Sequence, residues 1–442
     1  MKRTLIASLL VVCSQSLFAD DLLEVYQTAL ERDPVLREAA AKRESQREAK
    51  PLALSQLLPQ VGVSGNATYK YNDFKHAPSQ DYSVNDLSIG VNQPIYRRDR
   101  FMRLEQADWQ LELADAQYRS AEQDLMLRVA TAYFNVLSAQ EALKFVRADK
   151  KAIARQLEQA KQRFEVGLIA ITGVHEAQAR YDQAVTNEIL AVNELDSKWE
   201  DLRQILGMRP ETLADLKKEI PLEPPMPADI DEWSRMGLTN SPDVKVASDA
   251  TQIAQREIEV QRSGHYPTLD LFGSYGTVDS SRDNALFDDV NDGTVGLALN
   301  VPIYQGGGVV AATRQARADL IAAQERLDQA RRETDKQVRN AYRALQASIS
   351  AVKSLQAGIV SAKSALDATT AGFDVGTRTM VDVLNAQRDY YRAQGDHAKA
   401  RYVYMTAALA LKRAAGVLTK EDLAQANTLL TENPKGTEQP EN

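Results

Sequence analysis

The chain of 442 residues contains the same series of motifs twice, and this internal repeat limits its possible folds more than any other feature. Three pairs of segments match in the same order: 58–65 (LPQVGVSG) with 266–273 (YPTLDLFG), 92–96 (NQPIY) with 300–304 (NVPIY), and 163–168 (RFEVGL) with 372–377 (GFDVGT). The members of a pair lie about 208 or 209 residues apart, so the register is kept with roughly one insertion. We therefore expect two similarly folded repeats, at residues 20–225 and 226–417.

The N-terminus has the pattern of a secretory signal peptide. Two basic residues precede an apolar run at residues 5–12, and Ala19 stands before an acidic pair. This pattern predicts that residues 1–19 are removed as a signal peptide. A short transmembrane anchor is the alternative, although the run is shorter than the roughly 20 residues of a spanning helix. Lipid attachment at Cys13 is disfavoured, because Val12 is larger than the residue that a lipoprotein signal carries at that place.

Cysteine usage and charge exclude several classes of function. Cys13 is the only cysteine, so the chain after the leader has no thiol for disulfides, thiolate catalysis or Cys-based metal sites. The formal net charge is −8, and loss of the leader makes it two units more negative. This acidic balance argues against nucleic acid as a partner. Every long segment after residue 20 carries charges, so a membrane could be entered only through β-strands.

Four segments alternate between apolar and polar residues with period two. From Val61 to Tyr71 the odd positions are apolar, small or aromatic, and the even positions are polar or glycine. We predict strands with this alternation at residues 60–72, 84–96, 267–278 and 293–304. Such a pattern places one face of a strand in an apolar medium and the other in water. Each segment also has about the length of a tilted membrane-spanning strand, which needs roughly 9–11 residues.

Four strands are too few to form a membrane barrel alone. Closure needs about eight strands, and an open edge in lipid costs several kcal/mol for each unpaired backbone group. Several copies must therefore pool their strands. Two copies give eight strands and three give twelve, and the twelve-stranded barrel is wide enough for a lumen. The polar segments at residues 73–82 and 279–292 are predicted to be its outward-facing loops. A soluble sheet covered by helices is the alternative, but no apolar helix lies between the paired strands.

Very long helices follow each pair of strands. Residues 100–165 contain neither proline nor glycine, which predicts one helix on the order of 100 Å at 1.5 Å per residue. The second repeat has its equivalent at residues 309–371. Returning helices are predicted at residues 174–206 and 380–415, after turns in which Gly167 and Gly376 act as helix stops. Their sparse, alanine-rich apolar positions indicate a wall of packed helices with water on one side; an ordinary coiled coil is the alternative.

The remaining segments connect or end these elements. Residues 21–53 and 242–262 are predicted to be further helices. The proline-rich residues 207–240 read as a linker between the repeats, and residues 418–442 as a polar C-terminal tail that ends in disorder.

The sequence offers no constellation for catalysis. Its four histidines, His76, His175, His265 and His397, are scattered and lack the spacing of metal ligands. Residues 306–308 (GGG) follow a strand and open a helix, but without the Lys-Ser/Thr ending of a phosphate loop they read as a flexible corner. No nucleophile elbow or Ser-His-Asp order is present. We therefore expect no catalytic, cofactor-binding or metal site, and no enzyme.

The duplicated Pro-Ile-Tyr corner, the motifs FEVGL and FDVGTRT, and the following VDVL at residues 381–384 resemble the TolC family of outer-membrane efflux proteins. The resemblance covers nearly the whole chain after the leader. It implies a homotrimer in which a twelve-stranded outer-membrane barrel continues into a long α-helical tunnel across the periplasm. The implied function is passive exit of drugs, toxins or secreted proteins in a tripartite efflux or type I secretion system. Implied partners are a periplasmic adaptor (membrane fusion) protein, an inner-membrane pump or ABC translocase, and outer-membrane lipid.

The resemblance also implies roles for residues at the two helix turns. The tips that would meet the adaptor comprise Val166, Gly167, Leu168, Val375, Gly376 and Thr377. Arg378 matches a gate arginine that would make a charge-assisted link to the neighbouring hairpin near Thr172. Asp382 matches an aspartate that forms an acidic ring at the tunnel entrance. Without the resemblance, Arg378 and Asp382 would read as a solvated pair at a helix start, favoured by the helix dipole.

Three positions depart from the family pattern. Gly173 stands where the gate has an aspartate, Phe373 where it has a tyrosine hydroxyl, and Asn385 where a second entrance ring is acidic. These departures predict a gate held by fewer polar links, a more easily opened channel and weaker block by cations. They also predict that the second hairpin, which keeps Arg378 and Asp382, is the moving part. A cell-surface receptor and a structural periplasmic coiled-coil protein are the alternative functions.

Overall fold

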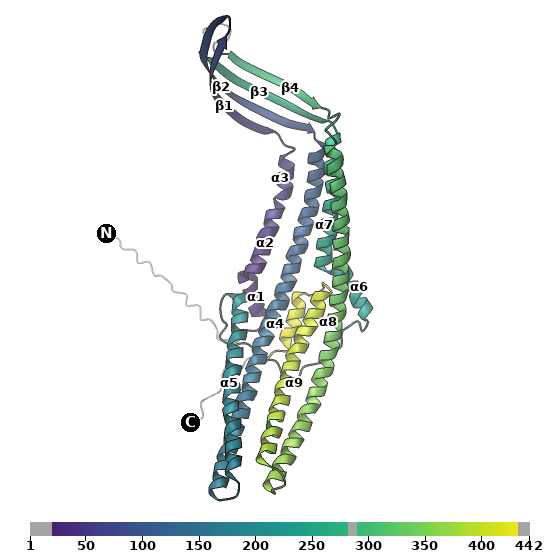
Figure 1. Ribbon diagram of the computed structural model, residues 1–442. Coiled ribbons are helices and arrows are strands. Elements are labelled where there is room, and N and C mark those ends of the chain that lie inside the picture. Colours follow the sequence, from purple (N-terminus) through teal and green to yellow (C-terminus); the bar gives the residue numbers. More distant parts are fainter. Residues whose placement is uncertain (1–19, 282–289, 432–442) are drawn as a thin grey trace, which may run out of the picture. The chain divides into compact units, whose positions relative to one another are not determined.

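The computed structural model describes residues 20–281 and 290–431. The expected signal peptide, most of the second predicted loop and the end of the C-terminal tail lie outside the described residues. The chain divides into two compact units, each of which draws on both halves of the sequence. The sheet unit comprises residues 38–121 and 238–336, and the helical unit comprises the described parts of residues 1–37, 122–237 and 337–442. Figure 1 shows the chain and labels β1 to β4 and α1 to α9.

The sheet unit contains one antiparallel sheet of four strands in the order β1-β2-β3-β4. The strands are β1 (Gln60–Phe74), β2 (Ala77–Tyr96), β3 (Thr268–Ser280) and β4 (Val290–Asn300). Val61 pairs with Val91, Val91 with Gly273, and Gly273 with Val295, so one row of small and apolar residues crosses all four strands on one face. Period-two alternation in the sequence therefore becomes one continuous apolar face, as predicted.

No element among residues 20–281 and 290–431 covers this apolar face. Val63 and Val295 are 70% and 82% exposed, and the apolar residues around them on all four strands are also exposed. At about 25 cal/mol for each Å² of apolar surface, leaving such a face in water is unfavourable. Within this one chain, β1 and β4 each pair on one side only. The apolar face of the sheet therefore needs an apolar environment or a covering partner, and its two edge strands need further strands to pair with.

Helices adjoin the strands at one end of the sheet unit. They are α3 (Ala49–Ser55), α7 (Pro242–Arg262), and the first parts of α4 (Arg98–Glu165) and α8 (Gly308–Asp374). Arg97 forms a bidentate salt bridge with Asp270 on β3 where β2 gives way to α4. Bidentate arginine–carboxylate pairs fix geometry well, because two parallel hydrogen bonds define one orientation. This pair therefore fixes the strand-to-helix corner.

The helical unit is built around a core of aromatic and aliphatic side chains. Its helices are α1 (Leu22–Arg32), α5 (Ile171–Leu206), α9 (Met380–Ala414), α10 (Lys420–Thr428), the later parts of α4 and α8, and most of α6 (Ile230–Asn240). Tyr26, Tyr133 and Phe134 are fully buried there. The Tyr133 hydroxyl donates to the Ala214 carbonyl at 2.8 Å, which satisfies its polar end in the core. No helix in the described part of the chain combines the length and apolar character needed to cross a membrane.

The long helices have almost the expected bounds. The predicted helices 100–165, 174–206, 309–371 and 380–415 correspond to α4, α5, α8 and α9. Residues 21–53 form three helices instead of one, because Pro34 and a break at Glu48 separate α1, α2 (Pro34–Arg47) and α3. A proline has no N–H for the preceding helix to use, so α1 ends before it.

Other expectations need correction. Most of the predicted loop at residues 73–82 is strand, since β1 runs to Phe74 and β2 begins at Ala77. The expected strand 293–304 begins earlier and ends at Asn300, shortly before Pro302, which cannot donate to a ladder. The predicted linker contains α6, whose Trp233 is buried and donates to the Pro227 carbonyl. The predicted tail contains α10, with Leu423 fully buried.

Candidate functional site

The turn between α4 and α5 has the geometry of a Schellman helix stop. Gly167 adopts φ +78°, where a residue with a side chain is strained. The N–H of Leu168 donates to the Arg163 carbonyl at 2.8 Å, and the N–H of Gly167 donates to the Phe164 carbonyl at 2.9 Å. These bonds satisfy the last carbonyls of α4 and reverse the chain. At the start of α5, Ala170 is the N-cap residue and provides no side-chain hydrogen bond.

The turn between α8 and α9 repeats this stop. Gly376 has φ +81°, the N–H of Thr377 donates to the Gly372 carbonyl at 2.8 Å, and the N–H of Gly376 donates to the Phe373 carbonyl at 3.1 Å. The Thr377 hydroxyl donates to the same Gly372 carbonyl. The duplicated Val-Gly motif therefore produces the same turn twice.

The start of α9 differs from that of α5. Thr379 is its N-cap residue, and its hydroxyl accepts a hydrogen bond from the Asp382 N–H at 3.2 Å. Asp382 Oδ2 in turn accepts from the Thr379 N–H and hydroxyl, each at 2.9 Å. The hydrogen bonds from Thr379, first from its backbone and then from its side chain, hold the pKa of Asp382 below its ordinary value. Asp382 is thus part of a capping box, which the reading as a helix-start residue anticipated.

Apolar side chains project from both turns. Val166, Leu168 and Val375 are 71%, 73% and 77% exposed. Single exposed apolar residues are common on protein surfaces, but here they are grouped at the turns. The turns are held by glycine and backbone hydrogen bonds and do not require these side chains. Both tips therefore expose apolar side chains to the surroundings.

The predicted gate residues surround these turns but do not bond to one another within one chain. The Arg378 N–H donates to the Gly372 carbonyl at 3.2 Å, and Arg378 Cγ lies 2.8 Å from the place of a Cβ at position 372. The Arg378 guanidinium has no hydrogen-bond or salt-bridge partner among the described residues of this single chain. Thr172 and Gly173 lie in the first turn of α5. The link between Arg378 and Thr172 stays a prediction for the assembled protein.

Two arginines that the sequence reading missed join the first hairpin to the second. Arg163 Nη2 donates to Asp374 Oδ1 at 3.2 Å, and its guanidinium lies 4.7 Å from the centre of the Phe373 ring. Arg180 Nη2 donates to Asn385 Oδ1 at 3.0 Å. The signal for Arg163 was present in the repeat, because it aligns with Gly372 and is therefore found in one copy only. Arg180 had no such signal.

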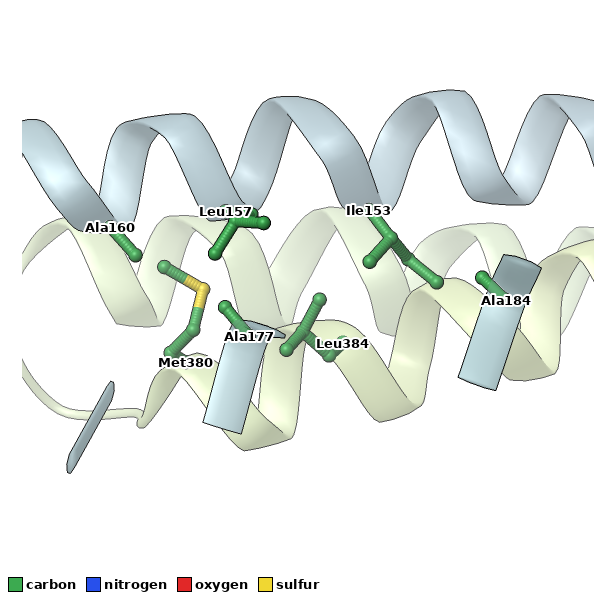
Figure 2. Packing of buried hydrophobic residues seen from close by; sticks show 7 residues of the cluster. All are labelled: Ile153, Leu157, Ala160, Ala177, Ala184, Met380 and Leu384. Carbon is green, nitrogen blue, oxygen red and sulfur yellow. The ribbon is translucent and has the colours of Figure 1, made fainter. Parts of the chain in front are cut away.

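An apolar cluster fixes the hairpins beneath these polar contacts. It consists of Ile153, Leu157 and Ala160 on α4, Ala177 and Ala184 on α5, and Met380 and Leu384 on α9. Figure 2 shows Met380 and Leu384 directed toward the α4 side chains. Phe373 packs against the edge of the same cluster. The start of α9 is therefore anchored to the first hairpin by buried contacts as well as by Arg180.

A partly buried carboxyl group lies farther along the same helices. Asp149 accepts a hydrogen bond of 3.4 Å from Gln387 Nε2, and Gln387 is almost fully buried. Burial raises the pKa of Asp149, and the bond from Gln387 only partly opposes this effect. Among the described residues, no group of three or more His, Cys, Asp or Glu side chains is arranged to hold a metal ion.

The chain matches a family model described as outer membrane efflux protein over residues 25–208 and again over residues 233–417. It is 40% identical over 439 residues to outer membrane protein TolC of Vibrio cholerae serotype O1, covering 97% of this chain and 98% of that protein. It is 32% identical over 443 residues to alkaline protease secretion protein AprF of Pseudomonas aeruginosa, covering 97% and 92%.

The fold is shared with more distant solved structures. The CmeC outer membrane channel of Campylobacter jejuni aligns with a TM-score of 0.78 at 15% identity, covering 93% of this chain and 90% of that one. At this identity the likeness concerns the fold alone.

Proposed function

The chain belongs to the outer membrane efflux protein family, and we propose that three copies of it form one passive exit duct. As a member of this family, the protein is an outer-membrane channel for efflux or secretion that extends into the periplasm.

The uncovered sheet is the observation that supports a trimer. One chain provides four strands with an exposed apolar face and two edges that its own strands leave unpaired. Lipid tolerates no open edge, and four strands cannot close on themselves. Three sheets joined edge to edge give twelve strands, with the row from Val61 to Val295 facing lipid and the polar face lining a lumen.

The hairpin tips are proposed to meet a periplasmic adaptor. Val166, Leu168 and Val375 project from two turns held in the same shape by Gly167 and Gly376. Exposed apolar side chains on a rigid turn suit insertion into an apolar groove of a partner, because little conformational entropy is lost on binding. Through the adaptor, an inner-membrane pump or ABC translocase would supply energy and select the cargo. The duct itself then performs no chemistry.

The same ends of the hairpins are proposed to form the closed gate. In the described part of one chain the Arg378 guanidinium makes no hydrogen bond or salt bridge and acts on Asp382 through charge, so it can bond near Thr172 in the assembly. Gly173 and Phe373 have no polar side-chain group that could make a second hydrogen bond at the gate. Asp382 and Asn385 would line the entrance; both capping bonds of Asp382 use Oδ2, which leaves Oδ1 for a passing cation.

Electrical recording tests the duct directly. We expect the purified protein to insert into planar lipid bilayers and to produce uniform single-channel steps. A receptor or a structural coiled coil would produce none, and an absence of steps from protein that is correctly folded would overturn the proposal.

A susceptibility assay then separates conduction from adaptor binding. In a strain that lacks its own channel, the wild-type chain should restore drug resistance. The double variant Val166→Asp/Val375→Asp should reach the outer membrane and conduct in bilayers but restore no resistance. Full resistance with this variant would refute adaptor docking at the tips and leave the duct itself untouched.

A further inference from the structure

Arg163 joins the ends of the two hairpins through a single side chain. It lies in the last turn of α4, and both of its partners, Phe373 and Asp374, are the last two residues of α8. The guanidinium donates to Asp374 Oδ1 and lies over the Phe373 ring, so one cation makes an ion pair and a cation–π contact with adjacent residues. The contact spans 211 positions of sequence.

The repeat shows that this contact depends on divergence between the copies. Arg163, Phe164 and Glu165 align with Gly372, Phe373 and Asp374, so both copies have an aromatic residue and an acid at the helix end. Only the first copy has the cation. A Cβ at position 372 would lie 2.8 Å from Arg378 Cγ, so a side chain there would displace the predicted gate arginine. The first repeat therefore provides the cation Arg163, and the second repeat has Gly372 at the same place, which leaves space for Arg378.

The Phe373 ring strengthens the exposed ion pair between Arg163 and Asp374. Exposed ion pairs are weak in isolation because water screens them and side-chain entropy opposes them. Here the Arg163 and Asp374 side chains are 36% and 59% exposed, but Phe373 packs on the apolar cluster that holds α9 against α4 and α5. The ring positions the guanidinium, so less entropy is lost when the ion pair forms.

We propose that Arg163 is a latch that holds the second hairpin tip against the first within each protomer and so favours the closed gate. This inference rests on the proposed duct. The latch adds a closing contact in a chain where Gly173 and Phe373 provide no polar side-chain group at the gate. It is separate from the predicted link of Arg378 to Thr172.

Charge reversal tests the latch. Arg163→Asp places two carboxylates together, and we expect the closed-state conductance or open probability in bilayers to rise about threefold or more. The double variant Arg163→Asp/Asp374→Arg should return it toward the wild-type value, because the opposite charges are restored. Phe373→Leu, which keeps the apolar packing and removes the aromatic face, should raise it less.

Lys161→Asp is the matched control, because it makes the same charge change two residues earlier at an exposed position of α4. We expect it to leave conductance unchanged. If Arg163→Asp resembles Lys161→Asp, or if the double variant is as leaky as the single one, the latch is refuted.

A distance measurement keeps the test independent of conduction. After the leader the chain has no cysteine, so spin labels at Val166→Cys and Val375→Cys report on the two tips alone. Arg163→Asp should broaden or lengthen the distance distribution, and the charge-swapped pair should narrow it again. A protein that shows these changes but no channel steps would refute the duct and retain the contact; unchanged distances in a conducting protein would refute the latch and retain the duct.

Discussion

The two hairpin tips end their first helices alike and begin their second helices differently. After α4 and after α8, a glycine with positive φ and the same pair of backbone hydrogen bonds reverse the chain. At the next step α5 begins at Ala170 without a side-chain cap, whereas Thr379 and Asp382 form a capping box for α9. Duplication therefore preserved the turn, which depends on backbone conformation, and allowed the caps to diverge. The capping box holds the first turn of α9 together through contacts within α9 itself.

The largest expected effect concerns the burial of the second tip against the first hairpin. Leu384→Ala removes a side chain that is 2% exposed, and we expect about 2–5 kcal/mol of lost stability from burial and cavity formation. Leu168→Ala makes the same chemical change in the exposed first turn and should change stability by less than about 0.5 kcal/mol. Denaturant unfolding of the two variants measures the difference. Equal losses would mean that the first turn is buried to the same degree.

The shared turn should respond equally in both copies. Gly167→Ala and Gly376→Ala each force a side chain into the left-handed region, at a cost of roughly 1–2 kcal/mol. Nothing lies within 4 Å of a Cβ at either position, so backbone conformation alone should account for the cost. Hydrogen exchange at the neighbouring amides measures local opening. A clear difference between the two variants would show that the turns are not equivalent.

The caps should respond oppositely. Thr379→Ala should destabilise the start of α9 by about 1 kcal/mol. Ala170 and Gly173 hold the places in α5 that Thr379 and Asp382 hold in α9, so Ala170→Thr/Gly173→Asp transplants the capping box. A Cβ at Gly173 would lie 3.4 Å from the flexible end of Ile169, which can accept it. Hydrogen exchange should slow at the start of α5; unchanged exchange would show that another contact limits this tip.

The smallest effect is a pH dependence confined to the second tip. The folded-state pKa of Asp382 lies below its unfolded value, so its stabilising contribution is present above the ordinary pKa near 3.8 and is lost as pH falls through the folded pKa. Asp382→Asn should therefore destabilise α9 at pH 6, and the difference from wild type should shrink as the pH is lowered below about 3.8. Hydrogen exchange or thermal unfolding of both proteins over a pH series from 6 downward checks this. A constant difference would mean that the carboxylate charge contributes nothing to the cap.

Local patterns account for most of the elements that were predicted. Period-two alternation depends only on the pleat of a strand, and an unbroken run without proline or glycine favours a helix wherever it lies. Two expectations failed because burial overruled local composition. Residues 420–428 look polar, yet α10 forms because Leu423 and Ala426 pack into the core and Lys412 pairs with Asp422. Residues 230–240 look like linker, yet Trp233 anchors α6.

The sequence by itself determined the duplicated plan, the strand faces and the two glycine turns, because each follows from the preferences of a few consecutive residues. Only the tertiary structure decided which side chains meet. Nothing in the spacing of Arg163, Phe373 and Asp374 indicates contact, since 211 positions separate the ion pair. Their meeting depends on how the Ala-rich faces of α4, α5 and α9 pack around Leu384. Such packing is set by shape complementarity over whole helices, and no local pattern encodes it.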